Sequence, residues 1–211
     1  MTALVFALLP DQVCVAMDTL VIGAEDRLPL AFQRKFLSIP TSDLLVAGTG
    51  HAGLINGWFQ YLESLIRLGD IDDIGKFTQQ VLKASVDAAG GLGSITTTIY
   101  HFGYSRSESQ YVGYAYRSIS SFKPERLPYA LGFKPEVPVP ATDDMQFPDY
   151  LVDIVVRQQQ YDRSQPIQDR LGIGGEIEFA VLSNRKTHIE TVFRFTSYER
   201  EKLQIENRNE A

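Results

Sequence analysis

Cysteine, histidine and basic charge are scarce in this sequence, and each shortage excludes a class of protein. The 211 residues include one cysteine, Cys14, so no internal disulfide framework can form and a reducing compartment is expected. The net charge of −6 and a pI near 5.1 argue against a nucleic-acid-binding surface. The three histidines, His51, His101 and His188, have no partner at metal-ligand spacing, so we expect neither a metal nor another cofactor.

Long apolar runs are also missing. No stretch approaches the ~18 residues of a membrane span, and no basic segment precedes an apolar secretory core. The sequence has no internal repeat, no Gly-x-Ser-x-Gly motif and no phosphate loop with Lys-Ser or Lys-Thr. Its 44% hydrophobic and 22% charged residues are typical of a globular domain. We therefore expect a cytoplasmic protein with no nucleic-acid and no membrane partner.

Blocks of strand-like and helix-like pattern predict a mixed α+β domain with an antiparallel core. The apolar runs at 2–9 and 13–18, joined by a turn, predict two strands buried on both faces. Residues 1–197 are expected to form a single domain, and 198–211 a charged C-terminal tail that frays. Asp73 is expected to cap the second of three helices. Hairpin strands are expected at 33–39 and 44–48, further strands at 19–23, 94–104, 109–118, 127–132, 176–182 and 187–195, helices at 51–68, 73–89 and 150–161, and an irregular loop at 133–149.

Thr2 begins the first predicted strand and is placed for chemistry that an internal threonine cannot perform. Once Met1 is removed, its hydroxyl is a nucleophile and its α-amino group, with a pKa of about 7.7–8.0, is a base suited to neutral pH. Asp18 ends the second predicted strand and Lys35 begins a later apolar run, so a carboxylate and a cation could activate the hydroxyl. Gly48 ends a further buried run, and its backbone N–H could receive an oxyanion.

In this order the residues resemble the N-terminal nucleophile hydrolases, specifically proteasome β subunits and the related bacterial ring peptidases. In that family the aspartate stands sixteen residues after the nucleophile, as Asp18 does after Thr2. The family lysine stands thirty-two residues after it, at the place of Arg34. We assign the role to Lys35, because the family lysine directly precedes its strand, as Lys35 does. The residues that carry the resemblance are Thr2, Val15-Ala16-Met17-Asp18, Lys35-Phe36-Leu37-Ser38-Ile39 and Ala47-Gly48-Thr49-Gly50.

The resemblance implies a four-layer αββα sandwich and a threonine-type peptidase. Thr2 would attack a peptide or amide carbonyl, with its own free amine as general base. Lys35, held by Asp18, would lower the pKa of the hydroxyl, and the Gly48 N–H would stabilise the tetrahedral oxyanion. The resemblance also implies a homo-oligomeric ring or stacked ring. It leaves open whether an ATP-dependent unfoldase is a further partner.

The later part of the chain departs from the family pattern. The family carries Gly-Ser-Gly after the strand that here reads 130–132, but this chain continues Phe133-Lys134. The family carries Asp-x-x-Ser-Gly before the penultimate strand; here Arg170 takes the aspartate place and Ile173 the serine place, with Asp169 one residue out of register. Both serines are missing, which favours the first of two alternatives that stay open. One is an inactive ring-forming scaffold of the same fold, and the other is an amidase of small molecules.

Overall fold

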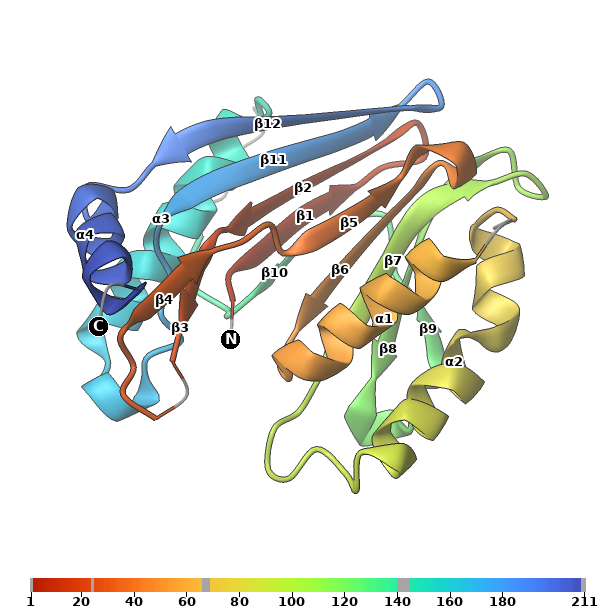
Figure 1. Cartoon of the computed structure of the whole chain (residues 1–211). Helices are drawn as coiled ribbons and strands as arrows, with labels where there is room; N and C mark the ends of the chain where they lie inside the picture. The colour runs from red at the N-terminus through yellow and green to blue at the C-terminus, as the bar shows by residue number, and fades with distance from the viewer. Residues whose placement is uncertain (1, 24, 66–68, 140–144, 210–211) are drawn as a thin grey trace.

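The computed structural model describes residues 2–23, 25–65, 69–139 and 145–209, and these form a mixed α+β structure (Figure 1). The strands are β1 (Leu4–Leu8), β2 (Gln12–Asp18), β3 (Leu20–Ile22), β4 (Pro29–Phe32), β5 (Phe36–Ile39), β6 (Leu44–Thr49), β7 (Thr98–Ser105), β8 (Gln110–Arg117), β9 (Pro124–Arg126), β10 (Leu131–Lys134), β11 (Glu176–Ser183) and β12 (Lys186–Arg194). The helices are α1 (Ala52–Ser64), α2 (Ile71–Ala88), α3 (Asp149–Ser164) and α4 (Tyr198–Asn209).

Most strands belong to two five-stranded antiparallel sheets. The first sheet has the order β10-β1-β2-β11-β12 and the second has the order β5-β6-β7-β8-β9, while β3 pairs with β4 alone. The predicted hairpin of β1 and β2 is present, with Leu4 opposite Met17. This register brings Asp18 back beside the start of the chain, because the two strands of a hairpin run side by side in opposite directions.

The buried apolar side chains form three clusters: one between the two sheets, and one on the outer face of each sheet. In β1, Leu4, Phe6 and Leu8 belong to the cluster that the two sheets share, whereas Val5 and Ala7 belong to the cluster with α3. This division follows from the alternation of side chains along a strand. A third cluster joins the second sheet to α1 and α2. Figure 1 accordingly shows α3 against the first sheet and the α1–α2 pair against the second.

The three predicted helices are present with shifted ends. The end expected for the first helix, at 66–68, lies outside the described residues. The expectation that Asp73 caps the second helix is wrong. The side chain of Asp70 accepts hydrogen bonds from the backbone N–H groups of Asp72 and Asp73, at 3.1 and 3.2 Å. Asp70 therefore satisfies the donors that a helix N-terminus leaves free, and α2 begins earlier than expected.

The expectation of one strand at 127–132 is also wrong, because β10 begins only at Leu131. This segment joins β9, at the edge of the second sheet, to β10, at the edge of the first. Pro128 lies between the two short strands, where its missing N–H does not interrupt a ladder. The segment is therefore a crossing between the sheets and not one strand.

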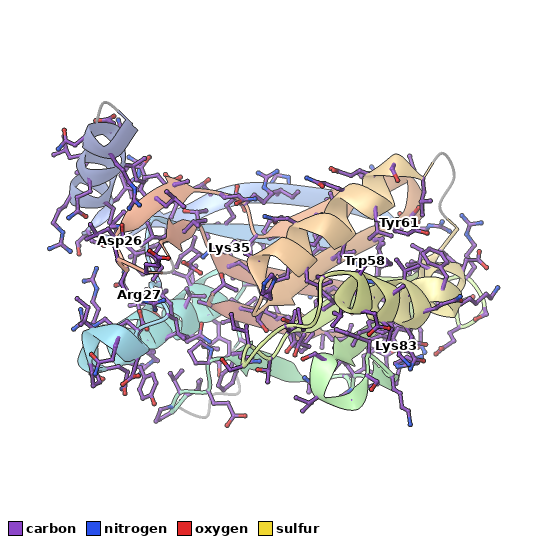
Figure 2. All side chains as sticks on the ribbon, turned by 60° about the horizontal axis from the view of Figure 1, so that its bottom comes forward. Asp26, Arg27, Lys35, Trp58, Tyr61 and Lys83 are labelled. Carbon is purple, nitrogen blue, oxygen red and sulfur yellow. The ribbon has the colours of Figure 1, made fainter. Side chains whose placement is uncertain are left out.

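The last residues, whose charged sequence we expected to fray, form helix α4 against β4 (Figure 1). The ring of Tyr198 stacks on Phe32, with ring centroids 4.7 Å apart. Near the other end, Arg208 pairs with Asp26 at 2.7 Å; Figure 2 labels Asp26 below this helix. Glu201 is only 5% exposed. The charges of α4 therefore hold it to the body of the protein.

Candidate active site

Asp18, the last residue of β2, is the centre of the candidate site. It is fully buried, and its two oxygens accept four hydrogen bonds. Oδ1 accepts from the Thr2 hydroxyl at 2.8 Å and from the Ala3 N–H at 2.9 Å. Oδ2 accepts from the Lys35 amine at 2.8 Å and from the Gly174 N–H at 3.2 Å. Each oxygen thus accepts two hydrogen bonds, so neither oxygen of this buried side chain lacks a partner.

Lys35 reaches Thr2 through Asp18. Its amine donates to Asp18 and, at 2.6 Å, to the carbonyl oxygen of Leu20. Figure 2 shows Lys35 between α1 and the β3–β4 hairpin, near the middle of the molecule. Burial lowers the pKa of the Lys35 amine below its ordinary value, while the Asp18 carboxylate opposes the shift. The structure thus brings Thr2, Asp18 and Lys35 into one connected group.

Arg34, the alternative to Lys35, faces elsewhere. Its guanidinium donates to both carboxylate oxygens of Glu178, at 2.7 to 3.1 Å. The Arg34 side chain is 50% exposed, against 12% for Lys35. In the connection between β4 and β5, these two consecutive side chains therefore reach different carboxylates. Lys35, and not Arg34, contacts Asp18.

Gly48 lies in β6 on the wall of the same pocket as Thr2 and Lys35. A side chain could not fit there, because a Cβ atom would lie 2.7 Å from a carbon of Ile55. Gly50, two residues further on, has a φ of +115° and would place a Cβ 2.2 Å from the Thr96 carbonyl oxygen. Both glycines therefore let α1 and β7 approach the chain beside Thr2.

Two pockets meet at Thr2 and Gly50. The smaller, of about 130 Å³, is lined mainly by apolar side chains of β3 and α1, with Arg34 and Lys35 at its wall. The larger, of about 600 Å³, lies between β10 and the second sheet. Thr2 itself is only 6% exposed. A substrate bound at Thr2 could therefore place one part in each pocket.

The loop before β11 is held to the site by carboxylates. Each of the five consecutive residues 171–175 donates its backbone N–H to a buried acid. Leu171, Gly172 and Ile173 donate to Asp162 of α3, Gly174 donates to Asp18, and Gly175 donates to Glu201 of α4 at 2.9 Å. Three acids from three elements therefore fix the loop that contacts Asp18.

Asp162 and Glu201 were not singled out from the sequence. The only local signal is the glycine content of 172–175; Gly172 and Gly175 have φ values of +78° and +76°, which glycine adopts without strain. At the serine place of the family, the side chain of Ile173 is buried in the apolar cluster with α3. The loop is thus held through its backbone, and it presents no hydroxyl at that position.

Cys14 does not contribute a second nucleophile. Burial, with a smaller contribution from the charge of Asp11, raises its pKa to about 12, so the thiol is protonated at neutral pH. Within the described ranges, no group of three or more His, Cys, Asp or Glu side chains is arranged to hold a metal ion. Over the same residues, none of the helices combines the length and apolar character needed to cross a membrane.

The comparisons with known proteins support the fold. No family model matches the chain, and no curated protein matches it in sequence. Among solved structures, it is similar to the Anbu (Gly-1) mutant from Hyphomicrobium sp. strain MC1, with a TM-score of 0.67 and 12% sequence identity. The likeness covers 100% of this chain and 94% of that one. At this level of sequence identity, the likeness shows that the two chains share a fold over nearly their full lengths.

Proposed function

We propose that this protein is an N-terminal threonine hydrolase of peptide or amide bonds, formed when Met1 is removed. The observation that carries the proposal is the connected group of Thr2, Asp18 and Lys35 where two pockets meet. Met1 lies outside the described residues. Its removal would leave the Thr2 amine as a base on the same residue as the nucleophile.

In the proposed reaction, Asp18 holds the Thr2 hydroxyl by accepting its hydrogen bond. The hydroxyl then turns its single proton from Asp18 toward the free Thr2 amine, which takes the proton as Oγ1 attacks the substrate carbonyl carbon. The Gly48 N–H is proposed to donate to the oxyanion that forms. Collapse of this intermediate breaks the amide bond, and the leaving amine takes the proton from the Thr2 ammonium. Water then hydrolyses the ester and frees Thr2.

The electrostatic role of Lys35 in this scheme is indirect. Its amine lies 2.8 Å from the oxygen of Asp18 that does not contact Thr2, and its positive charge faces that buried carboxylate. One oxygen of the Asp18 carboxylate accepts the hydrogen bond of the Thr2 hydroxyl while the other accepts from Lys35. We therefore propose Lys35 and Asp18 as positioning residues for Thr2.

The four-layer αββα sandwich and the homo-oligomeric assembly belong to the same proposal. The three apolar clusters support the layer order, since each joins one neighbouring pair of layers. The assembly follows from the resemblance to ring peptidases and is proposed to operate in the cytoplasm.

An inactive scaffold of the same fold is the second candidate. Ile173 favours it, because this buried apolar side chain stands where the family has a serine. The small size of the apolar pocket, about 130 Å³, favours a third variant, an amidase of small molecules. Turnover of short peptides against small amides separates the two enzymes once a working nucleophile is established.

The test is intact mass and N-terminal sequencing of the purified protein, before and after a threonine-directed β-lactone. We expect loss of Met1 and one adduct on Thr2. Thr2→Ser should keep the adduct, because serine retains the hydroxyl, whereas Thr2→Ala should lose it. Retained Met1 with no adduct would support the scaffold, and an adduct that persists in Thr2→Ala would refute the assignment of the nucleophile.

A further inference from the structure

Strand β10 forms one wall of the larger pocket beside Thr2. Lys134 ends β10 and lies opposite Leu4 of β1 in the antiparallel register. Directly opposed residues in a sheet point to the same face, and Leu4 belongs to the cluster between the two sheets. Lys134 therefore points toward the second sheet, and it lines the pocket that contains Thr2.

Lys134 is a partly buried cation without a carboxylate partner within the part of the chain that the structure describes. Glu136 also lines the pocket, but its side chain is exposed and makes no ion pair with Lys134. Burial, and then the charge of Arg117, lower the pKa of the Lys134 amine. Burying an unpaired charge is unfavourable, so an anion from outside would stabilise this site.

Arg117 supplies a second positive group on the facing wall. It ends β8 and lines the same pocket. Its guanidinium donates to both oxygens of Glu125, at 2.9 and 3.2 Å, so its own charge is already balanced. Among the described residues that line the pocket, Lys134 is therefore the cation without an ion pair, and the exposed Glu136 is an acid on the same wall. The remaining wall combines apolar side chains, among them Phe6 and Leu127, with threonines at positions 2, 49 and 96.

We propose that this pocket binds a carboxylate of the substrate, with Lys134 as its counter-ion. A ligand with one carboxylate on an otherwise apolar molecule could pair its charge with Lys134 and place its apolar part against Phe6 and Leu127. The carboxylate could be an Asp or Glu side chain, or the free C-terminus of a short peptide. The proposal rests on the proposed function for the bond that is cut at Thr2, but the binding itself needs no nucleophile.

Titration calorimetry on the Thr2→Ala protein at pH 7 tests the proposal with two pairs of probes. The first pair is acetyl-Ala-Ala-Glu-amide against acetyl-Ala-Ala-Gln-amide, and the second is acetyl-Ala-Ala-Ala as the free acid against its amide. We expect the acid of at least one pair to bind about tenfold or more tightly than its neutral match. The pair that discriminates identifies the side chain or the terminus as the source of the carboxylate.

Lys134→Met in the Thr2→Ala background should remove this preference, and Lys123→Met should retain it. Lys123 is exposed and lines none of the pockets at Thr2, so it controls for the loss of one positive charge. No binding, equal binding of acid and neutral probes, or a preference that survives Lys134→Met would overturn the proposal. These outcomes leave hydrolysis open, since that is judged by the β-lactone adduct on Thr2.

Discussion

Removing one partner of the Lys35–Asp18 ion pair should destabilise the fold by several kilocalories per mole. Asp18 is fully buried, and the Lys35 side chain is 12% exposed. Removing one partner of a buried ion pair typically costs about 3–5 kcal/mol, because the other charge is left uncompensated. Asp18 keeps three other donors after Lys35→Met, so we expect a loss near the lower end, about 3 kcal/mol. Asp18→Asn should cost a similar amount.

The double variant Asp18→Asn/Lys35→Met removes both charges together. We expect it to lose about 3 kcal/mol, and not the ~6 kcal/mol of the two single variants added, since neither charge is then stranded. The measurement is the free energy of unfolding from urea titrations at pH 7 and one fixed protein concentration. Losses that add to within ~0.5 kcal/mol would refute the coupling of the pair.

Arg34→Met is the matched control for this cycle. Arg34 is the neighbour of Lys35 and pairs with Glu178, but its side chain is 50% exposed. Exposed ion pairs contribute about 0–1 kcal/mol. Because Glu178 is only 13% exposed, Arg34→Met should cost about 1 kcal/mol, the upper end of that range. If Arg34→Met lost as much free energy of unfolding as Lys35→Met, the burial of Lys35 would not explain the cost of removing its charge.

Two further predictions concern buried acid and base groups. Burial lowers the pKa of His101 to about 3, and its Nε2 accepts a hydrogen bond from the Trp58 indole N–H. Below about pH 6.5, this histidine binds a proton in the unfolded chain but not in the native state. The free energy of unfolding should therefore fall by about 1.4 kcal/mol for each pH unit below 6.5. Urea titrations at pH 7 and pH 5 should show a loss about 2 kcal/mol smaller in His101→Gln, and an unchanged loss would contradict this. Glu201→Ala should cost about 1–3 kcal/mol by leaving the Gly175 N–H unpaired. It should also speed hydrogen exchange there, whereas Glu199→Ala, exposed on the same helix, should do neither.

Much of the fold was predictable because its signals are local. The apolar runs of β1 and β2 identify a hairpin, and a hairpin of that length brings Asp18 back beside Thr2. Lys35 could be preferred over Arg34 because its place at the start of a strand is visible in the sequence. The nearness of Thr2 to Asp18 is therefore a consequence of the hairpin, whereas the contact of Lys35 with Asp18 also depends on the connection between β4 and β5.

The rest of the site depends on contacts between distant segments. Asp162 lies in a helix with mostly polar residues, and Glu201 lies in a run of charges that suggests a solvated tail. Neither residue differs in local pattern from an exposed acid. Their burial is decided by where α3 and α4 pack against the loop at 171–175, which no short-range spacing encodes. The split of the segment at 127–132 between two sheets is a similar case.

The order in which the ribosome makes these parts gives the loop contacts a further meaning. Thr2, Asp18 and Lys35 all lie within the first thirty-five residues, but the loop that donates to Asp18 is made much later. Glu201, the acceptor for the Gly175 N–H, comes later still. A growing chain therefore contains its candidate nucleophile before it contains the loop at 171–175 and Glu201, which hold the surroundings of Asp18 in place. The order of synthesis therefore means that these contacts can form only after residue 201 has been made.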